Sequence, residues 1–546
     1  MVPLAKFIFV TGGVLSSVGK GAVCASIGKI LQIRGFAVTA VKIDPYLNFD
    51  AGTMNPFEHG EVFVCEDGGE MDLDLGTYER FLDVNLSRDA NITTGQIYGS
   101  VIEKERKGVF LGKCVQIIPH ITDEIKNRIK NAANRNSVDA VLVECGGTVG
   151  DIESLPFLEA LRQIRIEEGY INTLFVHVPL VPILKATKEQ KSKPAQHSIQ
   201  ELRRIGLQPD MIVGRCSEIL KKETIRKIAL FGSVDERAVF TSPDVRSIYE
   251  LPFILDEQGL GDFVCDRLNL NHRSYDWANW LKIITSIVNA RNDVKIAICG
   301  KYATFVDSYI SINEALKHAG GACDTIVNVT LIETELFEKK PKSLRSLKNY
   351  DGILVPGGFG VRGTEGKISA IQHARENNIP FLGICFGFQL AAVEFARNAC
   401  KLEKANSTEI DKDTPHPVID LLPEQRNLKY KGATMRLGAM PITIIPKTLA
   451  YSLYQKSEII ERHRHRYEIN PVYHYALKER GLVFSGLTPD YKRVEILELP
   501  NHFFFFATQF HPEFLSRPGK PDPSFHGFIK AALGKKIGTN KFIFNN

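Results

Sequence analysis

The chain has 546 residues, too many for one hydrophobic core, so we expect two domains of about 200–300 residues each. Hydrophobic residues make up 44% and charged residues 24% of the chain, and the formal net charge is only +5. This composition is typical of a globular protein and gives no support for nucleic-acid or membrane binding through bulk charge. The ten cysteines include no CxxC pair, which argues against a zinc site or a disulfide framework and favours a cytoplasmic location.

Short apolar runs, separated by longer amphipathic segments, define the predicted strands. They are expected at Phe7–Val10, Ala37–Ile43, Ala140–Val143, Thr173–Val178, Met211–Val213, Lys295–Ile298, Gly352–Val355, Phe381–Ile384 and Phe503–Thr508. Strands that alternate with helices favour the α/β class, here two domains with doubly wound parallel sheets. Such sheets bind their ligands at the carboxyl ends of the strands.

The predicted domain boundary lies just before Asp293, where a new sheet begins. A helical stripe over residues 277–288 contains both tryptophans of the chain, Trp277 and Trp280, and we expect these rings to be buried against a domain surface. We therefore predict a first domain over residues 1–268, a linker over 269–292, a second domain over 293–536 and a loose tail over 537–546.

The first predicted strand runs into Thr11-Gly-Gly-Val-Leu-Ser-Ser-Val-Gly-Lys-Gly, a glycine-rich loop followed by the start of a helix. Backbone N–H groups of such a loop, the helix dipole and Lys20 form a cradle for a triphosphate. The match to a P-loop is imperfect, because five residues separate Gly13 from Gly19 and Gly21 replaces the usual magnesium-binding hydroxyl. An ordinary tight turn is the alternative.

Asp74 and Glu144 are candidates for the missing magnesium ligands. Asp72-Leu-Asp74 is expected to present two carboxylates on one face of an extended segment, and Glu144 ends a predicted buried strand. Magnesium prefers one or two carboxylates together with phosphate oxygens. Alternatively, Asp74 caps a turn and Glu144 pairs with a lysine.

A basic segment, Lys191-Ser-Lys-Pro-Ala-Gln-His-Ser, is a candidate for binding a second polyphosphate. In an extended segment, Lys191 and Lys193 would point to the same side. A solvated basic loop would show the same pattern.

Cys385 lies in Pro380-Phe-Leu-Gly-Ile-Cys-Phe-Gly-Phe-Gln, which reads as strand, sharp turn and helix. Glycines flank a nucleophile in such an elbow because the turn leaves no room for side chains. His511, in Gln-Phe-His-Pro-Glu after the apolar run Phe503–Ala507, is the candidate base, and Glu513 can fix its tautomer. Pro356-Gly-Gly-Phe-Gly ends another strand and offers backbone N–H groups for an oxyanion hole. The combination predicts a glutaminase.

Arg462-His-Arg-His-Arg466 superficially suggests a nucleic-acid-binding patch, but no basic surface flanks it in the sequence. A mobile loop over an active site, or an exposed turn, is the preferred interpretation.

With these motifs together, the chain resembles the CTP synthase family over nearly its whole length. The segments Lys42-Ile-Asp-Pro-Tyr-Leu-Asn, His59-Gly-Glu-Val-Phe-Val, Asp72-Leu-Asp-Leu-Gly, Glu144-Cys-Gly-Gly-Thr-Val-Gly-Asp-Ile-Glu and Asn406-Ser-Thr-Glu strengthen the likeness. The first domain is similar to a P-loop-like synthetase domain and the second to a class I glutamine amidotransferase. The implied reaction has ATP phosphorylate the 4-oxygen of UTP, after which ammonia from glutamine displaces phosphate to give CTP.

The resemblance also implies roles for individual residues. It assigns Cys385, His511 and Glu513 to glutamine hydrolysis, and Asp74 and Glu144 to Mg²⁺. It assigns to ATP Ser17, Val18, Gly19, Lys20, Gly21, Ala22 and Asp74. It assigns to UTP or CTP Ser16, Asp151, Ile152, Glu153, Lys191, Ser192, Lys193, Pro194, Ala195, Gln196 and Lys227. It assigns to glutamine Gly358, Phe386, Gly387, Phe388, Gln389, Glu409 and Arg466.

Five positions depart from the usual family pattern, one of which is Ser192, where Thr is usual in the UTP segment. Phe386 and Phe388 stand where Leu and Met are usual, and the larger rings are expected to narrow the glutamine pocket. Ala195 lacks a hydroxyl usually present in the UTP segment, and Pro243 replaces a common lysine near the adenine.

The family likeness further implies activation by GTP, inhibition by CTP, an internal ammonia channel, homotetramers and filaments, with no nucleic-acid or membrane partner. Two other functions remain as alternatives. One is a different amidotransferase such as a GMP synthetase, whose Ser-Gly-Gly-x-Asp-Ser loop we do not find in the sequence. The other is a nucleotide-switch or filament scaffold with a vestigial glutaminase.

Overall fold

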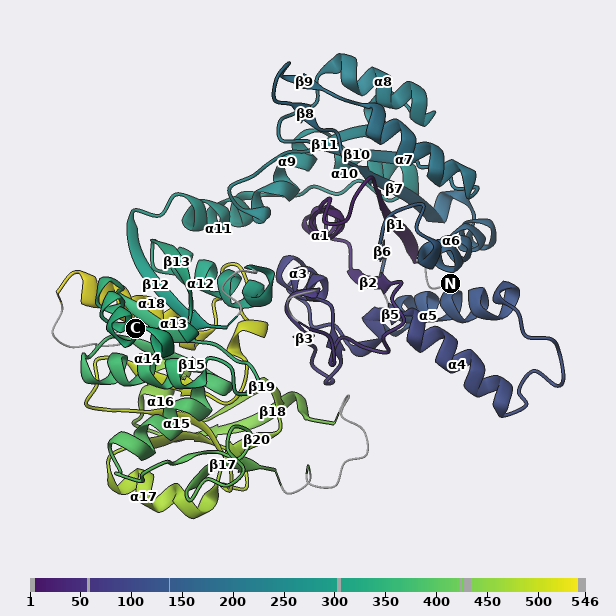
Figure 1. The fold of residues 1–546 in the computed structure, drawn as a ribbon. Coiled ribbons are helices and arrows are strands. Elements are labelled where there is room, and N and C mark those ends of the chain that lie inside the picture. The colour runs from purple at the N-terminus through teal and green to yellow at the C-terminus, as the bar shows by residue number, and fades with distance from the viewer. Residues whose placement is uncertain are drawn as a thin grey trace. The chain divides into compact units, whose positions relative to one another are not determined.

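The computed structural model describes residues 5–55, 59–136, 138–301, 306–422, 425 and 434–538. Most of the predicted tail, residues 539–546, lies outside this part of the chain. The chain forms two compact units: unit 1 is Met1–Ala51 with Asp74–Ile284, and unit 2 is Gly52–Leu73 with Thr285–Asn546. The segment Gly52–Leu73 thus belongs with the second half of the sequence. Figure 1 shows the elements of each unit.

Unit 1 is built on a sheet in which every neighbouring pair of strands runs parallel. In spatial order the strands are β11 (Val239–Ser242), β10 (Met211–Arg215), β7 (Thr173–Pro179), β1 (Lys6–Gly13), β6 (Ala140–Cys145), β2 (Val38–Asp44) and β5 (Asn91–Thr93). Strand β1 lies between β7 and β6, so the glycine-rich loop leaves the middle of the carboxyl edge. Ligands of open parallel sheets bind at this edge.

Helices lie between the strands of this sheet in the sequence, and three more follow its last strand. They are α1 (Lys20–Ile33), α3 (Leu73–Leu82), α4 (Thr94–Arg106), α5 (Thr122–Asn136), α6 (Leu155–Glu168), α7 (Lys193–Arg204), α8 (Lys222–Gly232), α9 (Leu251–Glu257), α10 (Leu260–Leu268) and α11 (Ala278–Val288). Helices α5 and α6 cover one face, where Phe9, Val143 and Phe157 are fully or almost fully buried together. The near-continuous apolar runs of the strands match a sheet that is buried on both faces.

Both tryptophans are buried, as predicted. Trp277 is 8% exposed and donates its indole N–H to Asp256, at 2.8 Å, and Trp280 is 6% exposed and donates to the carbonyl of Tyr249, at 3.0 Å. A buried indole needs such an acceptor. These rings therefore fix the helical segment around α11 to unit 1.

Unit 2 contains a larger sheet that is parallel at one end and antiparallel at the other. The parallel strands are β13 (Thr325–Glu333), β12 (Asn292–Gly300), β14 (Gly352–Val355), β15 (Phe381–Ile384) and β23 (Phe505–Thr508). The sheet continues antiparallel through β22 (Val494–Glu498), β21 (Val483–Leu487), β18 (Arg436–Ile444) and β19 (Glu458–His465). The α/β class with doubly wound parallel sheets is confirmed, and the antiparallel extension adds to it.

Helices cover both faces of the parallel strands. They are α12 (Ile310–Ala322), α13 (Glu335–Lys339), α14 (Thr364–Glu376), α15 (Phe386–Asn398), α16 (Leu449–Tyr454), α17 (His474–Glu479) and α18 (Pro523–Lys536). Along β12, Ile296 and Ile298 join the core that contains α12 and α18, whereas Ala297 and Cys299 join the core that contains α14 and α15. This alternation is the period of two expected for a strand between two layers.

Two smaller sheets complete unit 2. One pairs β16 (Asn406–Ser407), β17 (Pro417–Leu421) and β20 (Tyr467–Ile469), and the other pairs β3 (Phe63–Val64) with β4 (Glu70–Met71). Among the described helices of the chain, none has the length and apolar character that a bilayer crossing requires.

Candidate active sites

Cys385 lies at the sharp turn between β15 and α15. Its backbone has φ 49° and ψ −95°, a strained conformation for a residue with a side chain. A Cβ at Gly387 would lie 2.1 Å from the carbonyl oxygen of Val355, and one at Gly383 would lie 3.0 Å from Ala507 Cβ. The two glycines are therefore required by close packing, which holds the thiol at the end of the strand.

His511 and Glu513 follow β23, the strand next to β15. His511 Nδ1 lies 2.8 Å from Glu513 Oε1. Burial lowers the pKa of His511, but the charges of Glu513 and Cys385, together with hydrogen bonds to both, outweigh it and raise the pKa to about 10. Gly357 permits this approach, because a Cβ there would lie 3.0 Å from His511 Cε1 and 3.7 Å from Cys385 Cβ. The structure thus brings the three predicted catalytic side chains together.

These three residues line an open pocket with an empty volume of about 630 Å³. The other lining residues are Glu61, Val62, Ser308, Tyr309, Ile312, Pro356, Gly357, Gly358, Phe359, Arg464 and Phe514. Glu61 and Val62 come from the segment Gly52–Leu73, far from the rest in the sequence. Sequence reasoning missed them, and only their place in the motif that starts at His59 could have drawn attention to them.

Residues 462–466 do not form a loop or an exposed turn, so that prediction is wrong. Arg462 to His465 belong to β19, which pairs with β18, and Arg462 and His463 are fully buried. Arg464 reaches the pocket, where its Nε lies 2.8 Å from Glu70 Oε1. β19 is the edge strand of the sheet, and the hairpin of β3 and β4 supplies acceptors to its arginines: Arg462 Nη1 donates to the carbonyl of Val64 at 3.0 Å.

The predicted glutamine-binding residues fall into two groups. Glu409 lies beside the pocket wall, where its Oε1 accepts the N–H of Gly360 at 2.7 Å and burial raises its pKa. Arg466 donates to the side chains of Gln425 and Thr434, at 2.7 and 2.9 Å. Phe386 and Phe388, by contrast, are 1% and 0% exposed in the core and are not among the pocket-lining residues.

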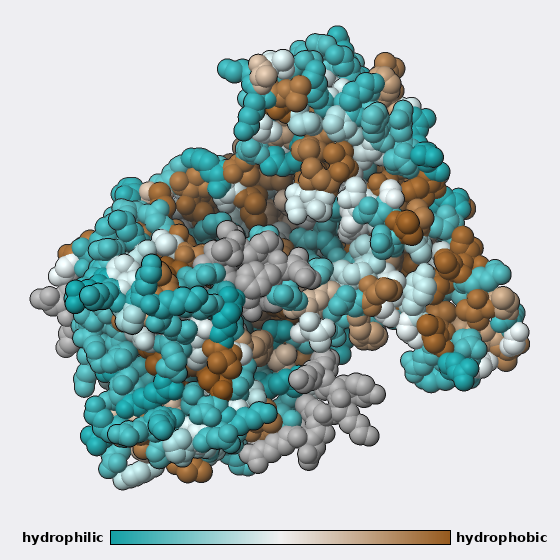
Figure 2. Space-filling model, viewed as in Figure 1, coloured by the Kyte–Doolittle hydropathy of each residue, from teal (hydrophilic) through white to brown (hydrophobic). Residues whose placement is uncertain are grey.

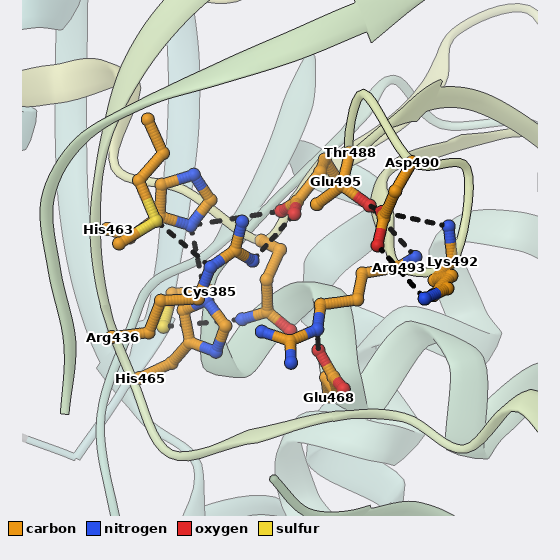
Figure 3. Close-up of polar contacts among 12 residues, drawn as sticks. Cys385, Arg436, His463, His465, Glu468, Thr488, Asp490, Lys492, Arg493 and Glu495 are labelled. Atoms are coloured by element: carbon orange, nitrogen blue, oxygen red, sulfur yellow. Dashed lines mark hydrogen bonds and ion pairs between the residues drawn. The ribbon is translucent and has the colours of Figure 1, made fainter. Parts of the chain in front are cut away.

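A buried polar network lies behind the thiol (Figure 3). Figure 3 shows His463 and His465, whose Nδ1 and Nε2 atoms are 3.1 Å apart. His465 Nδ1 donates to the carbonyl of Tyr467 at 2.9 Å, and Gln389 donates to the same carbonyl at 2.8 Å. His463, His465 and Glu495 have ligand-type atoms within 4.8 Å of one another. Arg436, at 2.6 Å from Glu495, already supplies a positive charge there. We therefore interpret the group as a hydrogen-bonded support rather than a metal site.

In unit 1, the loop between β1 and α1 has the strained geometry of a phosphate-binding turn. Val14 and Ser17 have φ values of 80° and 57°, and Gly19 has φ 93°. Lys20 begins α1 and donates to the carbonyl of Gly147 at 2.7 Å. A Cβ at Gly12 would lie 2.6 Å from the Lys20 side chain, so the glycine makes room for the lysine to cross the strand end.

Asp74 and Glu144 converge beside this loop. A Cβ at Gly21 would lie 2.6 Å from Asp74 Oδ1 and 3.5 Å from Glu144 Oε2. Lys42 pairs with both carboxylates, at 2.9 Å from Glu144, so the alternative that Glu144 pairs with a lysine is what the structure shows. The Tyr78 hydroxyl also bonds Glu144. The segment around Asp74 is not extended as predicted, because α3 begins at Leu73 and Asp74 lies in its first turn. An acidic residue is favourable there because it interacts with the positive end of the helix dipole.

The residues predicted for UTP follow the ends of β1, β6 and β7, and Lys227 lies on α8. Lys193 is the first residue of α7, so the prediction of an extended segment is wrong; Pro194 suits the first turn of a helix. Lys191 pairs with Glu189 and Lys227 with Glu223, at 2.7 and 2.6 Å, while Asp151 accepts the N–H of Thr148 at 2.7 Å. Ala195 is fully buried.

With this geometry described, comparison with known proteins gives a consistent result. A family model for the CTP synthase N-terminus matches residues 6–270, and one for class-I glutamine amidotransferases matches residues 304–531. The CTP synthase of Thermococcus kodakarensis is 57% identical over 537 residues, covering 98% of this chain and 100% of the relative. That of Methanocaldococcus jannaschii is 55% identical over 539 residues, covering 98% and 99%.

Among solved structures, the glutaminase domain of Trypanosoma brucei CTPS with bound acivicin is similar to part of this chain. It is 37% identical, with a TM-score of 0.43, and covers 46% of this chain and 96% of that chain.

A synthetase part followed by a class I glutaminase part defines the class: an enzyme that joins carbon to nitrogen with glutamine as the amido donor. The lengths and identities of the matches define the family more narrowly. The chain belongs to the CTP synthase family. This assignment rules out the GMP-synthetase-type alternative and makes the chain a glutamine-hydrolysing ligase rather than a non-catalytic scaffold.

Proposed function

We propose that the chain makes CTP from UTP: ATP phosphorylates the 4-oxygen of the uracil, and ammonia released from glutamine then displaces phosphate at C4. The main support is the geometry of the pocket: Cys385 lies in a strained elbow, and the His511–Glu513 pair lines the same open pocket. The sequence identity of 55–57% to proteins named CTP synthase supports the choice of UTP as substrate.

In the glutaminase reaction, His511 takes the proton of the Cys385 thiol and the sulfur attacks the carboxamide carbon. The carbonyl oxygen takes the negative charge and is held by the N–H groups of Gly358 and Phe386, the residue after the nucleophile. His511 then gives its proton to the departing ammonia. Water hydrolyses the thioester to release glutamate. Glu513 accepts the Nδ1–H of His511 and so keeps Nε2 directed to the sulfur.

Three further residues would hold glutamine. The Glu409 carboxylate suits the α-ammonium, since one of its oxygens is engaged by Gly360 and the other remains for the ligand. Arg466 suits the α-carboxylate, and Gln389 lies on the first turn of α15, close to the thiol.

In the synthetase reaction, residues 17–22 would hold the ATP phosphates, with Lys20 reaching the transferred group. Asp74 and Glu144 fit Mg²⁺, because two carboxylates converge over Gly21 at the loop. The ion would neutralise phosphate charge, and Lys42 would then share its carboxylate partners with it. Ser16, Asp151–Glu153, the segment Lys191–Gln196 and Lys227 would bind UTP or the inhibitor CTP.

Regulation and assembly belong to the same proposal. GTP would activate, CTP would inhibit, and the active form would be a cytoplasmic homotetramer that can extend into filaments. Support for self-association comes from exposed apolar side chains at and after α4, namely Ile102, Val109, Leu111, Ile117 and Ile118. Figure 2 shows hydrophobic side chains on this part of the surface.

The test is an absorbance assay for conversion of uracil to cytosine nucleotide. With UTP, ATP, Mg²⁺ and glutamine the chain should form CTP, and omission of any one should stop it. Conversion that proceeds without ATP, or none with all four present, would contradict the proposal. If glutamine is hydrolysed but no CTP forms, the glutaminase assignment would still hold, and UTP would be excluded as the substrate.

A further inference from the structure

Lys367, on α14, is a fully buried lysine behind the glutaminase pocket. Its side chain is 0% exposed, and Nζ has no hydrogen-bond acceptor among the residues that the structure describes. Lysines ordinarily extend their ammonium to water, and burying an unpaired ammonium is unfavourable. An apolar side chain would fill this position without the cost of burying a charge. We therefore look for a functional reason for the buried ammonium of Lys367.

The ammonium lies against two residues of the proposed oxyanion hole. A Cβ at Gly358 would lie 3.6 Å from Lys367 Nζ, and the Phe386 ring centre lies 5.0 Å from the same nitrogen. The Phe386 ring gives the cation partial compensation through its π face. Gly358 and Phe386 are the residues whose N–H groups would receive the negative oxygen of the substrate.

The loop in front of Lys367 is fixed from both sides. Lys301, which follows β12, donates to the carbonyl of Phe359, and Glu409 accepts the N–H of Gly360 at 2.7 Å. A Cβ at Gly358 would also lie 3.6 Å from Lys301 Cε. Lys301 and Lys367 therefore both lie beside Gly358 in the pocket wall.

The titratable groups that face Lys367 come from three places in the fold. They are Lys301 and Cys299 from the end of β12, Cys385 at the elbow, and Glu409 after β16. Burial first, and then the like charge of Lys301, lower the pKa of Lys367 to about 7. The ammonium is thus present below about pH 7 and is lost above it.

We propose that Lys367 is a positioning residue for glutamine hydrolysis, whose ammonium beside Gly358 strengthens the electrostatic stabilisation of the oxyanion formed on the substrate. This inference rests on the proposed function. As the Cys385 sulfur bonds to the carboxamide carbon, the C=O π electrons move to oxygen, and the new negative charge forms near the buried cation. No proton leaves Lys367 in this step. A charge fixed before the reaction stabilises the transition state more than the neutral ground state.

The test compares the full-length chain with Lys367→Met, which keeps the apolar stem and removes the charge. Glutamine hydrolysis is measured with ATP, UTP and Mg²⁺ from about pH 6 to about pH 9. We expect kcat to fall about 10-fold near pH 6, with KM for glutamine unchanged within about 2-fold. The ratio of wild-type to variant kcat should approach 1 near pH 9, because the wild-type lysine is then neutral. Titration of the triad cancels in this ratio.

Three control measurements separate loss of the Lys367 charge from misfolding. Lys339→Met, at a lysine whose side chain is 73% exposed, should match wild type at every pH. Ammonia-driven CTP formation should be unchanged in Lys367→Met, which shows that unit 1 is folded. If that variant does not fold, Lys367→Gln keeps a polar head group and should give the same convergence.

A loss that is the same at every pH would assign Lys367 a purely structural role, and equal kcat at every pH would assign it none; either overturns the inference. Absence of glutamine hydrolysis in the wild-type chain would instead overturn the proposed function.

Discussion

The two candidate centres lie at the same kind of place, the carboxyl edge of a parallel sheet, but they differ in how far the groups proposed to react are already in position. In unit 2, Cys385, His511 and Glu513 are 3%, 8% and 3% exposed and are fixed by a strained elbow and adjacent strands. In unit 1, Lys42 pairs with Asp74 and Glu144 themselves, and Ser16 and Ser17 are exposed. Covalent catalysis needs its groups positioned before the substrate arrives, whereas phosphates and a cation can replace the ion pairs that Lys42 makes with Asp74 and Glu144.

The largest expected effect separates the two centres completely. Cys385→Ala should lower glutamine-dependent CTP formation at least about 10,000-fold, since no other thiol can form the thioester. Ammonia-dependent formation should persist, because unit 1 is intact. Parallel assays with glutamine and with ammonium chloride check this. Loss of both activities in the well-folded variant would contradict two independent centres.

Glu513→Gln tests how far glutamine hydrolysis depends on the fixed orientation of His511. Glutamine hydrolysis should fall about 1,000-fold, because the amide cannot hold the imidazolium and favours the wrong tautomer. Glu479→Gln, at an exposed position, is the matched control. Equal hydrolysis rates in both variants would remove Glu513 from the triad.

The same Glu513→Gln substitution should change the pH dependence of stability. The folded-state pKa of His511, about 10, is above its ordinary value of 6.5. The imidazolium therefore contributes stability fully below about pH 6.5 and loses that contribution as pH rises through about 10. Thermal unfolding midpoints should differ most between wild type and variant near pH 6, and should converge toward pH 10. A difference that grows with pH would contradict this sign.

Lys20→Ala tests the candidate centre in unit 1 in the same way. Both glutamine- and ammonia-driven CTP formation should fall about 100-fold, since removal of one preorganised positive charge costs about that much. Hydrolysis of glutamine without nucleotides should be unchanged. Lys222→Ala, at an exposed lysine of α8, is the control. Normal ammonia-driven synthesis in Lys20→Ala would exclude Lys20 from phosphoryl transfer.

The smallest effect is expected at Phe388, which the sequence suggested would narrow the glutamine pocket. Because the ring lies wholly in the core, Phe388→Met should change KM for glutamine less than about 3-fold. It should lower the free energy of unfolding by less than about 1.5 kcal/mol. A large fall in KM would show that the ring restricts the pocket after all.

The sequence predicted the parts of each centre that depend on local pattern. An apolar run followed by Gly-Ile-Cys-Phe-Gly is sufficient to predict a strand and an elbow, and β14 and β15 have the bounds that were predicted. The ends of parallel strands then bring Cys385 and His511 together without further information. A lysine partner for Glu144 was one of the alternatives, but Lys42 was not identified as that lysine, and Arg464 was not expected at the pocket. A charged residue inside a strand pattern does not reveal which partner it will meet.

The local sequence pattern did not predict contacts between segments that are far apart in the chain. The segment Gly52–Leu73 joins unit 2 through contacts such as Phe63 with Phe514 and Arg464 with Glu70. Residues 462–466 looked like an exposed loop because their composition is polar. Pairing of β19 with β18, and acceptors from β3 and β4, instead bury Arg462, His463 and His465. Tertiary hydrogen bonds overrode composition at this point.

The central claim is that unit 2 frees a nitrogen atom and unit 1 installs it on a pyrimidine. Glutamine labelled with heavy nitrogen at the amide, incubated with UTP, ATP, Mg²⁺ and the purified chain, tests this directly by mass spectrometry of the cytidine nucleotide. The label should appear in essentially every CTP molecule formed, and Cys385→Ala supplied with unlabelled ammonia should give unlabelled CTP. CTP that forms from labelled glutamine without carrying the label would contradict the account.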